Sequence, residues 1–287
     1  MYAHFRKDPF FLQRYTVISF MILSILCLVM GLINSHLWPW LFVAVLFAHS
    51  SFWSVLMAWL VAIVFCFSTL DSISVSSIVL SVIAGLYVGI WSNVLIHNAS
   101  HQMIKPRWLN RLVGELTGLQ VLSGFPGFAV LHMEHHIHSD DHDLDPHPNL
   151  PGQTFWQYID GTRQRLRQTF SRMYQQTWKN HPEYWGSWKK VKWLLPLNRF
   201  LRAAFLLLLL GPREFTFFFI TSHVTTQLAF AVINYYSHER QPQGHVEIKN
   251  LDHNWIYWIL NRGFAGAFYH RNHHLNPKLF NPMNLRG

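Results

Sequence analysis

The chain carries little charge. Only 13% of its 287 residues are Asp, Glu, Lys or Arg, and 51% are hydrophobic, whereas soluble domains carry about 25% charged residues. From Tyr15 to Ile104 there is no Lys or Arg, and Asp71 is the only acidic residue. A single membrane span needs about 20 apolar residues. This stretch therefore excludes an ordinary soluble domain and predicts an integral membrane protein.

Cysteine is also scarce. Cys27 and Cys66 both lie in apolar stretches, so they predict neither a disulfide framework nor a sulfur-ligated metal site. The sequence also contains no His-Pro-Gly-Gly haem motif and no Gly-x-Gly-x-x-Gly dinucleotide motif. We therefore expect no fused electron-transfer module, so a redox reaction here would draw electrons from a separate protein.

The net charge of +9 does not indicate a nucleic-acid partner, because much of the positive charge is gathered in one segment between apolar blocks. The basic residues of this segment are Arg163, Arg165, Arg167, Arg172, Lys179, Lys189, Lys190, Lys192, Arg199 and Arg202. Such loops mark the cytoplasmic side of a membrane protein. We expect the segment in the cytoplasm, where it sets topology and contacts lipid head groups.

Hydropathy predicts membrane segments at 15–34, 37–69, 73–96, 196–212 and 214–236. The block 37–69 is too long for one ordinary span and short for two. Its Trp38-Pro39-Trp40 start and polar His49-Ser50-Ser51 indicate a short or re-entrant piece, followed by a span at 52–69. An even number of crossings before His97 would place the basic N-terminus and the later histidines on one side.

The remaining sequence predicts a helical cap on that side. Residues 105–131 are amphipathic and predict a helix in the membrane interface, broken at 123–127, and 152–195 extends the cap. The expected fold is a single all-α integral membrane domain, 1–287, with four to six transmembrane helices. Its membrane helices lie at 15–96 and 196–236, and a cytoplasmic, histidine-rich cap at 97–195 and 237–287 holds a site for two metals.

Four short clusters carry the chemistry. They read His97-Asn-Ala-Ser-His101, His132-Met-Glu-His135-His136, Asn234-Tyr-Tyr-Ser-His238 and His270-Arg-Asn-His273-His274. Spacings of three and four place side chains on one helix face. Neutral imidazole binds iron, zinc, copper and nickel. Nine histidines are too many for one metal, which takes about four to six ligands, and suit two.

Two other classes of protein use histidine and remain as alternatives. A membrane zinc hydrolase needs three ligands and a Glu base; Glu134 could serve, but six histidines would have no role. A metal transporter should carry its ligands near the middle of its spans, whereas these clusters lie at span ends. Both alternatives explain less of the pattern than a site that holds two metals.

The set HNASH, HMEHH, NYYSH and HRNHH resembles the histidine boxes of the membrane fatty-acid desaturase and hydroxylase superfamily, and HHIHSDDHDLDPHPN is similar to bacterial acyl-lipid desaturases. The resemblance spans residues 97 to 274. It departs from the commonest first box, which has an acidic residue where this chain has Asn98. The resemblance implies two iron ions held by His97, His101, His132, His135, His136, His238, His270, His273 and His274, with Asn234 approaching one metal through water.

The resemblance also implies an activity and partners. We expect an O2-dependent oxidation of an unactivated C–H bond in a long-chain lipid, most simply fatty acyl desaturation, with hydroxylation of an acyl chain, alkane or carotenoid as the alternative. The donor would be a ferredoxin or cytochrome with its reductase. The active site would lie on the cytoplasmic face of a bacterial inner membrane.

Two further groups of residues are expected around the metals. Carboxylates orient metal-bound imidazoles, and the candidates are Glu134, Asp140, Asp141, Asp143 and Asp145. An apolar tunnel between the emerging helices and the interfacial helix at 106–123 would admit the substrate, and its candidate lining residues are Trp91, Leu95, Leu119, Phe128, Phe230 and Tyr235.

Overall fold

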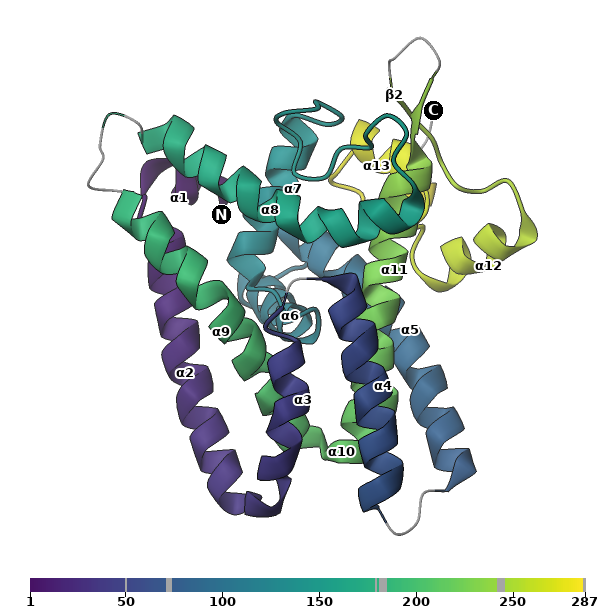
Figure 1. Ribbon diagram of the computed structural model, residues 1–287. Helices are drawn as coiled ribbons and strands as arrows, with labels where there is room; N and C mark the ends of the chain where they lie inside the picture. The colour runs from purple at the N-terminus through teal and green to yellow at the C-terminus, as the bar shows by residue number, and fades with distance from the viewer. Residues whose placement is uncertain (50, 71–73, 179, 181–184, 242–245, 286–287) are drawn as a thin grey trace.

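The computed structural model describes the whole chain except residues 50, 71–73, 179, 181–184, 242–245 and 286–287 (Figure 1). Among the described residues, five helices are long and apolar enough to cross a membrane. They are α2 (Phe11–Ile33), α4 (Phe52–Thr69), α5 (Val75–Ser100), α9 (Trp185–Leu210) and the stretch from α10 (Pro212–Glu214) through a π-helical turn (Phe215–Phe219) to α11 (Ile220–Ser237). The chain is an integral membrane protein, as the sequence predicts.

The apolar segment before α4 forms only short helices, as expected. A 3₁₀ turn (Ser35–Trp40) leads into α3 (Leu41–Leu46). If all of these residues were α-helical, they would rise about 18 Å, which is less than the hydrocarbon thickness of about 30 Å. The residues that follow bring the chain back to the cap side of the membrane. Ser51 Oγ donates to Asp160 Oδ1 of the cap helix α8 (Phe155–Trp178) at 2.6 Å. The N-terminus and the end of α5 therefore lie on one side of the membrane helices (Figure 1).

The cap consists of short helices and one hairpin, and α6 and α7 meet at 95°. This bend confirms the predicted break: Gly124 is the extended N-cap of α7, and Pro126 lies in its first turn, where its missing N–H costs no hydrogen bond. The remaining cap elements are α1 (Tyr2–Lys7), α6 (Arg107–Gln120), α7 (Phe125–Ile137), β1 (His238–Arg240), antiparallel β2 (Val246–Ile248), α12 (Trp255–Gly263), α13 (His270–Leu275) and a 3₁₀ turn (Pro282–Asn284).

Helix α9 begins earlier than hydropathy predicts. The membrane segment was expected from residue 196, but the helix starts at Trp185 and continues through Pro196. Its first turns bury Trp188 and Val191 against α8, and Trp188 stacks on Tyr174 with ring centroids 5.6 Å apart. A single rigid helix therefore links the cap to the membrane, because tertiary packing extends it beyond the apolar window.

Helices α5 and α11 approach each other very closely. A Cβ added to Gly89 of α5 would lie 2.5 Å from the carbonyl oxygen of Ser222, and one added to Gly85 would lie 2.7 Å from that of Phe218. Small residues four apart are the usual means of bringing two membrane helices together. This contact sets the relative positions of the two helix ends that carry His97 and His238.

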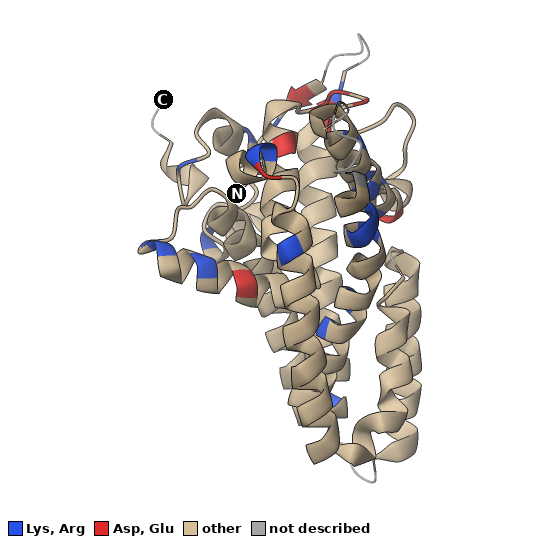
Figure 2. Cartoon of the chain, turned by 90° about the vertical axis from the view of Figure 1, so that its left-hand side faces the viewer, with Lys and Arg blue, Asp and Glu red and all other residues tan. Residues whose placement is uncertain are grey.

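Charge is distributed as a membrane protein requires. Lys, Arg, Asp and Glu side chains gather at the cap end, whereas the opposite half has very few (Figure 2). Large apolar side chains on the outer faces of the spans are exposed, including Leu32, Val64 and Leu80, each at least two-thirds exposed. These faces meet lipid, because in water such an apolar surface would be unfavourable.

Candidate metal centre

Five histidines form the first group. His97 lies in the last turn of α5 and His101 caps it, His132 and His136 lie on α7, and His273 lies on α13. One ring nitrogen from each falls within 4.8 Å of all the others. Segments up to 176 residues apart in the sequence thus converge on one point.

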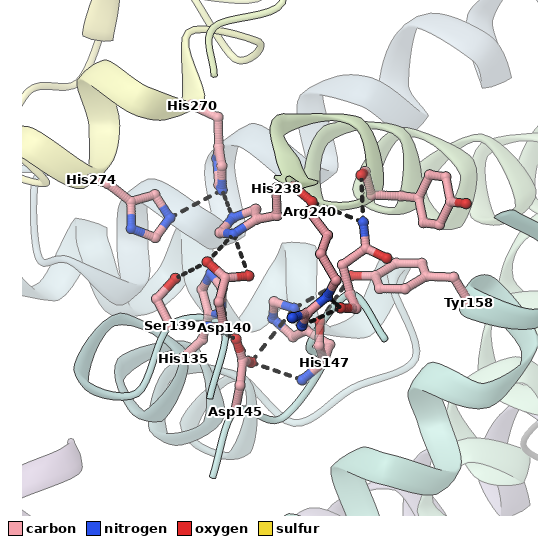
Figure 3. Close-up of polar contacts among 12 residues, drawn as sticks. His135, Ser139, Asp140, Asp145, His147, Tyr158, His238, Arg240, His270 and His274 are labelled. Atoms are coloured by element: carbon pink, nitrogen blue, oxygen red, sulfur yellow. Dashed lines mark hydrogen bonds and ion pairs between the residues drawn. The ribbon is translucent and has the colours of Figure 1, made fainter. Parts of the chain in front are cut away.

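Four histidines form the second group. His135 comes from α7, His238 from the end of α11, and His270 and His274 from α13, again with ring nitrogens within 4.8 Å of one another. In Figure 3 the rings of His238, His270 and His274 point toward one another. All nine predicted box histidines are therefore brought together, in two adjacent groups.

The division between the groups follows helical spacing. Successive residues of a helix point about 100° apart, so residues four apart share a face. On α7, His132 and His136 face the first group while His135 faces the second. On α13 the arrangement is reversed, because His270 and His274 face the second group and His273 faces the first. Both helices therefore contribute to both groups.

The ring nitrogens are spaced as metal ligands. In the first group the Nε2 atom of His273 lies 3.0 Å from that of His97 and 2.9 Å from that of His136. In the second group the Nε2 atoms of His238 and His270 are 2.9 Å apart. Nitrogens bound at about 2.1 Å and at right angles to one another would lie about 3.0 Å apart.

Two carboxylates decide which ring nitrogen carries the proton. Asp145 lies 3.0 Å from Nδ1 of His135, and Asp140 lies 2.8 Å from Nδ1 of His238. A carboxylate accepts, so the proton sits on Nδ1 and Nε2 presents a lone pair. The Nε2 atom of His135 is buried with no hydrogen-bond partner among the described residues. Lone pairs so close together repel unless a cation lies between them, so the residues fit a bound metal.

Burial favours the neutral form of several box histidines, which is the form that binds metal. Burial, reinforced by the neighbouring rings, lowers the pKa of His101 and of His136 to about 2. The same causes lower the pKa of His274 to about 3. Each ring is therefore uncharged at neutral pH.

The other candidate carboxylates do not contact box histidines. Glu134 accepts from the Tyr2 hydroxyl at 2.8 Å and lies 3.6 Å from Arg172. Asp141 accepts from two backbone N–H groups of its own turn. Asp143 is exposed and pairs with His142. Of the five candidate carboxylates, only Asp140 and Asp145 orient rings of box histidines among the described residues.

Asparagine contributes at two places. Asn98 Oδ1 lies 3.2 Å from Nδ1 of His97, so an amide oxygen takes the role expected of an acidic residue in the first box. Asn234 donates from Nδ2 to the carbonyl of Phe230 at 2.8 Å. Its side chain lines a small cavity of about 50 Å³ together with box histidines of both groups, His97 and His270 among them.

Two buried residues support the second group without having been assigned to it. The ring of His147 packs on that of His135 with centroids 4.2 Å apart, and its backbone N–H donates to Asp145. The hydroxyl of Tyr158 donates to the His147 carbonyl at 3.2 Å (Figure 3). His147 lies in the HHIHSDDHDLDPHPN run that carries the resemblance, but no sequence signal marks Tyr158, which lies on the separate helix α8.

A second, larger cavity of about 250 Å³ reaches the first group, since His132 lines it. Phe128 and Phe230 line it, as predicted. The other predicted tunnel residues, Trp91, Leu95, Leu119 and Tyr235, do not. The cavity lies between α2, α5, α7, α8, α9 and α11, and of the predicted interfacial helix only the end, residues 121–123, lines it. Helix α6 itself packs directly on α5, where Asn110 Nδ2 donates to the carbonyl of Ala99 at 2.9 Å.

Fold and site together define a membrane protein with two adjacent groups of histidines that could each hold a metal ion. A family model described as fatty acid desaturase matches residues 73–280, which include every histidine box, and the chain belongs to that family. It is therefore an oxidoreductase of lipid metabolism. Neither the curated proteins nor the solved structures contain a match.

Proposed function

We propose that the chain is a di-iron oxidase that uses O2 to desaturate a long acyl chain of a membrane lipid. The observation that carries the proposal is the division of nine imidazoles into adjacent groups of five and four, both built on α7 and α13. Imidazole suits iron, and a pair of irons side by side can activate O2 for the oxidation of an unactivated C–H bond.

The ligand assignment covers ten residues. The proposed iron ligands are His97, His101, His132, His135, His136, His238, His270, His273 and His274, with Asn234 near one metal through water. When bound, the metals supply the oxidising power. The protein holds the rings through Asp140 and Asp145, and it excludes water by burying the site.

The proposed setting is the cytoplasmic face of a bacterial inner membrane. The basic cap and the N-terminus lie at one end of the molecule, which the positive-inside rule places in the cytoplasm. Electrons come from a separate ferredoxin or cytochrome with its reductase.

The alternatives differ in their support. The same site could hydroxylate an acyl chain, an alkane or a carotenoid, and product analysis separates these outcomes. A zinc hydrolase would need Glu134 as its base. Glu134 is held by Tyr2 and lies beside Arg172, so its carboxylate is committed to contacts away from the ring nitrogens.

The test combines metal analysis with lipid profiling. Protein from iron-replete cells should contain about two irons per chain. Expression in a host that lacks such an enzyme, together with a compatible donor, should create a new double bond in extracted lipids that depends on O2. His273→Ala should abolish product and lower the iron content.

His142→Ala is the matched control, because His142 is an exposed histidine that pairs with Asp143 outside both groups. It should retain product formation and iron. A single metal per chain, full activity with zinc, or an unchanged lipid profile in iron-loaded cells supplied with donor would each contradict the proposal.

A further inference from the structure

Four arginines line the larger cavity. Arg163 and Arg167 come from α8, and Arg199 and Arg202 come from α9. They belong to the basic segment that the sequence assigned to topology alone. Among the residues that the structure describes, no Asp or Glu lines this cavity. The cavity therefore presents concentrated positive charge with no matching negative charge on its wall.

The hydrogen bonds of two of these arginines, Arg163 and Arg202, go to groups that carry no negative charge. Arg202 is 5% exposed, and its Nη2 donates to the hydroxyls of Tyr15 at 3.3 Å and Ser19 at 2.9 Å, both uncharged. Arg163 Nη2 lies 3.3 Å from His223 Nε2, and its Nη1 is buried with no hydrogen-bond partner among the described residues. A buried guanidinium without a counter-charge is unfavourable.

The arginines also repel one another. Burial and then the charge of Arg167 lower the pKa of Arg163 to about 10. The nearest acid that acts on Arg163 is Asp160, which already accepts hydrogen bonds at the start of α4. A bound anion would relieve this repulsion and satisfy the buried donors.

The rest of the same cavity is apolar. Ile96, Phe128, Leu131 and Phe230 line it on the way to His132 of the first histidine group. A further donor, Gln227 Nε2, is buried without a partner among the described residues and belongs to a residue that lines the wall. One cavity thus joins a basic region to an apolar region that reaches the histidines. A molecule with an anionic head and an apolar chain would match both regions.

We propose that the arginine cluster, Arg163, Arg167, Arg199 and Arg202, binds the phosphate of a phospholipid substrate, whose acyl chain extends along the apolar wall toward His132. Several guanidiniums suit the spread oxygens of a phosphate, which they bind through paired N–H groups. Exposure decreases from Arg167, which is exposed, to Arg202, which is buried, so the cluster extends inward from the mouth of the cavity. The part of this inference that concerns oxidation of the acyl chain rests on the proposed function, whereas binding of the head group does not.

Native mass spectrometry of the purified full chain tests this directly. The protein is offered equal amounts of phosphatidylglycerol, diacylglycerol with the same acyl chains, and the free fatty acid. We expect the wild type to retain phosphatidylglycerol preferentially, and Arg163→Gln to lower that retention by about tenfold, since a hydrogen bond to a charged group is lost. Arg163→Lys should give an intermediate value, because it keeps the charge but not the paired donors.

Lys190→Gln is the matched control, because Lys190 is an exposed basic residue of α9 that does not line the cavity. It should retain phosphatidylglycerol like the wild type. Equal retention of diacylglycerol and phosphatidylglycerol by the wild type, or preference for the fatty acid, would overturn the proposal even if Arg163→Gln failed to fold. The proposed function is tested separately by lipid profiling, so a chain that selects phosphatidylglycerol but leaves the lipid profile unchanged in iron-loaded cells supplied with donor would refute the proposed function and support the head-group site.

Discussion

Asp145 links a histidine ring to two stretches of backbone. Its carboxylate lies 3.0 Å from Nδ1 of His135 and accepts from the backbone N–H groups of His147 at 2.9 Å and Asp140 at 2.7 Å. Asp140 in turn faces Nδ1 of His238. One carboxylate therefore orients, directly or through a neighbour, two of the four rings of the second group and none of the first.

We predict that Asp145→Asn weakens the second metal selectively. Losing a carboxylate behind a ligand typically lowers metal affinity about 10–100-fold. The variant should fall from two metals toward one per chain during dialysis against a chelator, as measured by elemental analysis. Asp143→Asn, at an exposed acid of the same loop, should keep both metals. Equal losses from the two variants would disprove the orienting role of Asp145.

Among the contacts between elements, the close packing of α5 against α11 fixes the relative positions of His97 and His238 in the metal centre. We predict that Gly89→Ala lowers the free energy of unfolding by about 1–3 kcal/mol, because its methyl group would force the two backbones apart. Because α5 carries His97, metal content should fall as well. Thermal unfolding in detergent and elemental analysis measure the two effects.

Gly263→Ala is the control for that substitution. Gly263 ends α12, and a Cβ added there would meet no atom within 4 Å. Its unfolding temperature should stay at the wild-type value. A Gly89→Ala variant as stable as Gly263→Ala would mean that the close approach of α5 and α11 does not limit stability.

Features that depend on local sequence could be predicted, whereas features that depend on contacts between distant helices could not. The histidine spacings predicted which residues share a helix face, and hydropathy placed the spans, because both signals are local. The cavity was placed only in part, because its walls from α2, α8 and α9 depend on the pairing of α2 with α9, whose residues are far apart in the sequence. Tyr158 was missed for the same reason, since it reaches His147 from another helix.

For the whole molecule, the arrangement predicts opposite sides for two exposed positions. Asp143 lies in the cap loop, whereas Arg213 lies on α10 at the far end of the membrane helices (Figure 1). In intact spheroplasts, a membrane-impermeant maleimide should label Arg213→Cys, and it should label Asp143→Cys only after permeabilisation. The native Cys66 is buried and gives little background. Labelling of both variants from outside would reject the topology.

Helix α13 has a consequence for how the protein is made. It follows every membrane helix in the chain, yet it provides ligands to both metal groups. The loop before it is anchored by Asn261, whose side chain bonds Leu251 and Phe268. Neither site is complete until this segment folds back over the inserted helices. Metal binding contributes folding free energy only to a complete site. For the proposed di-iron protein, metal loading would therefore follow the insertion of every span and would stabilise only the fully inserted chain.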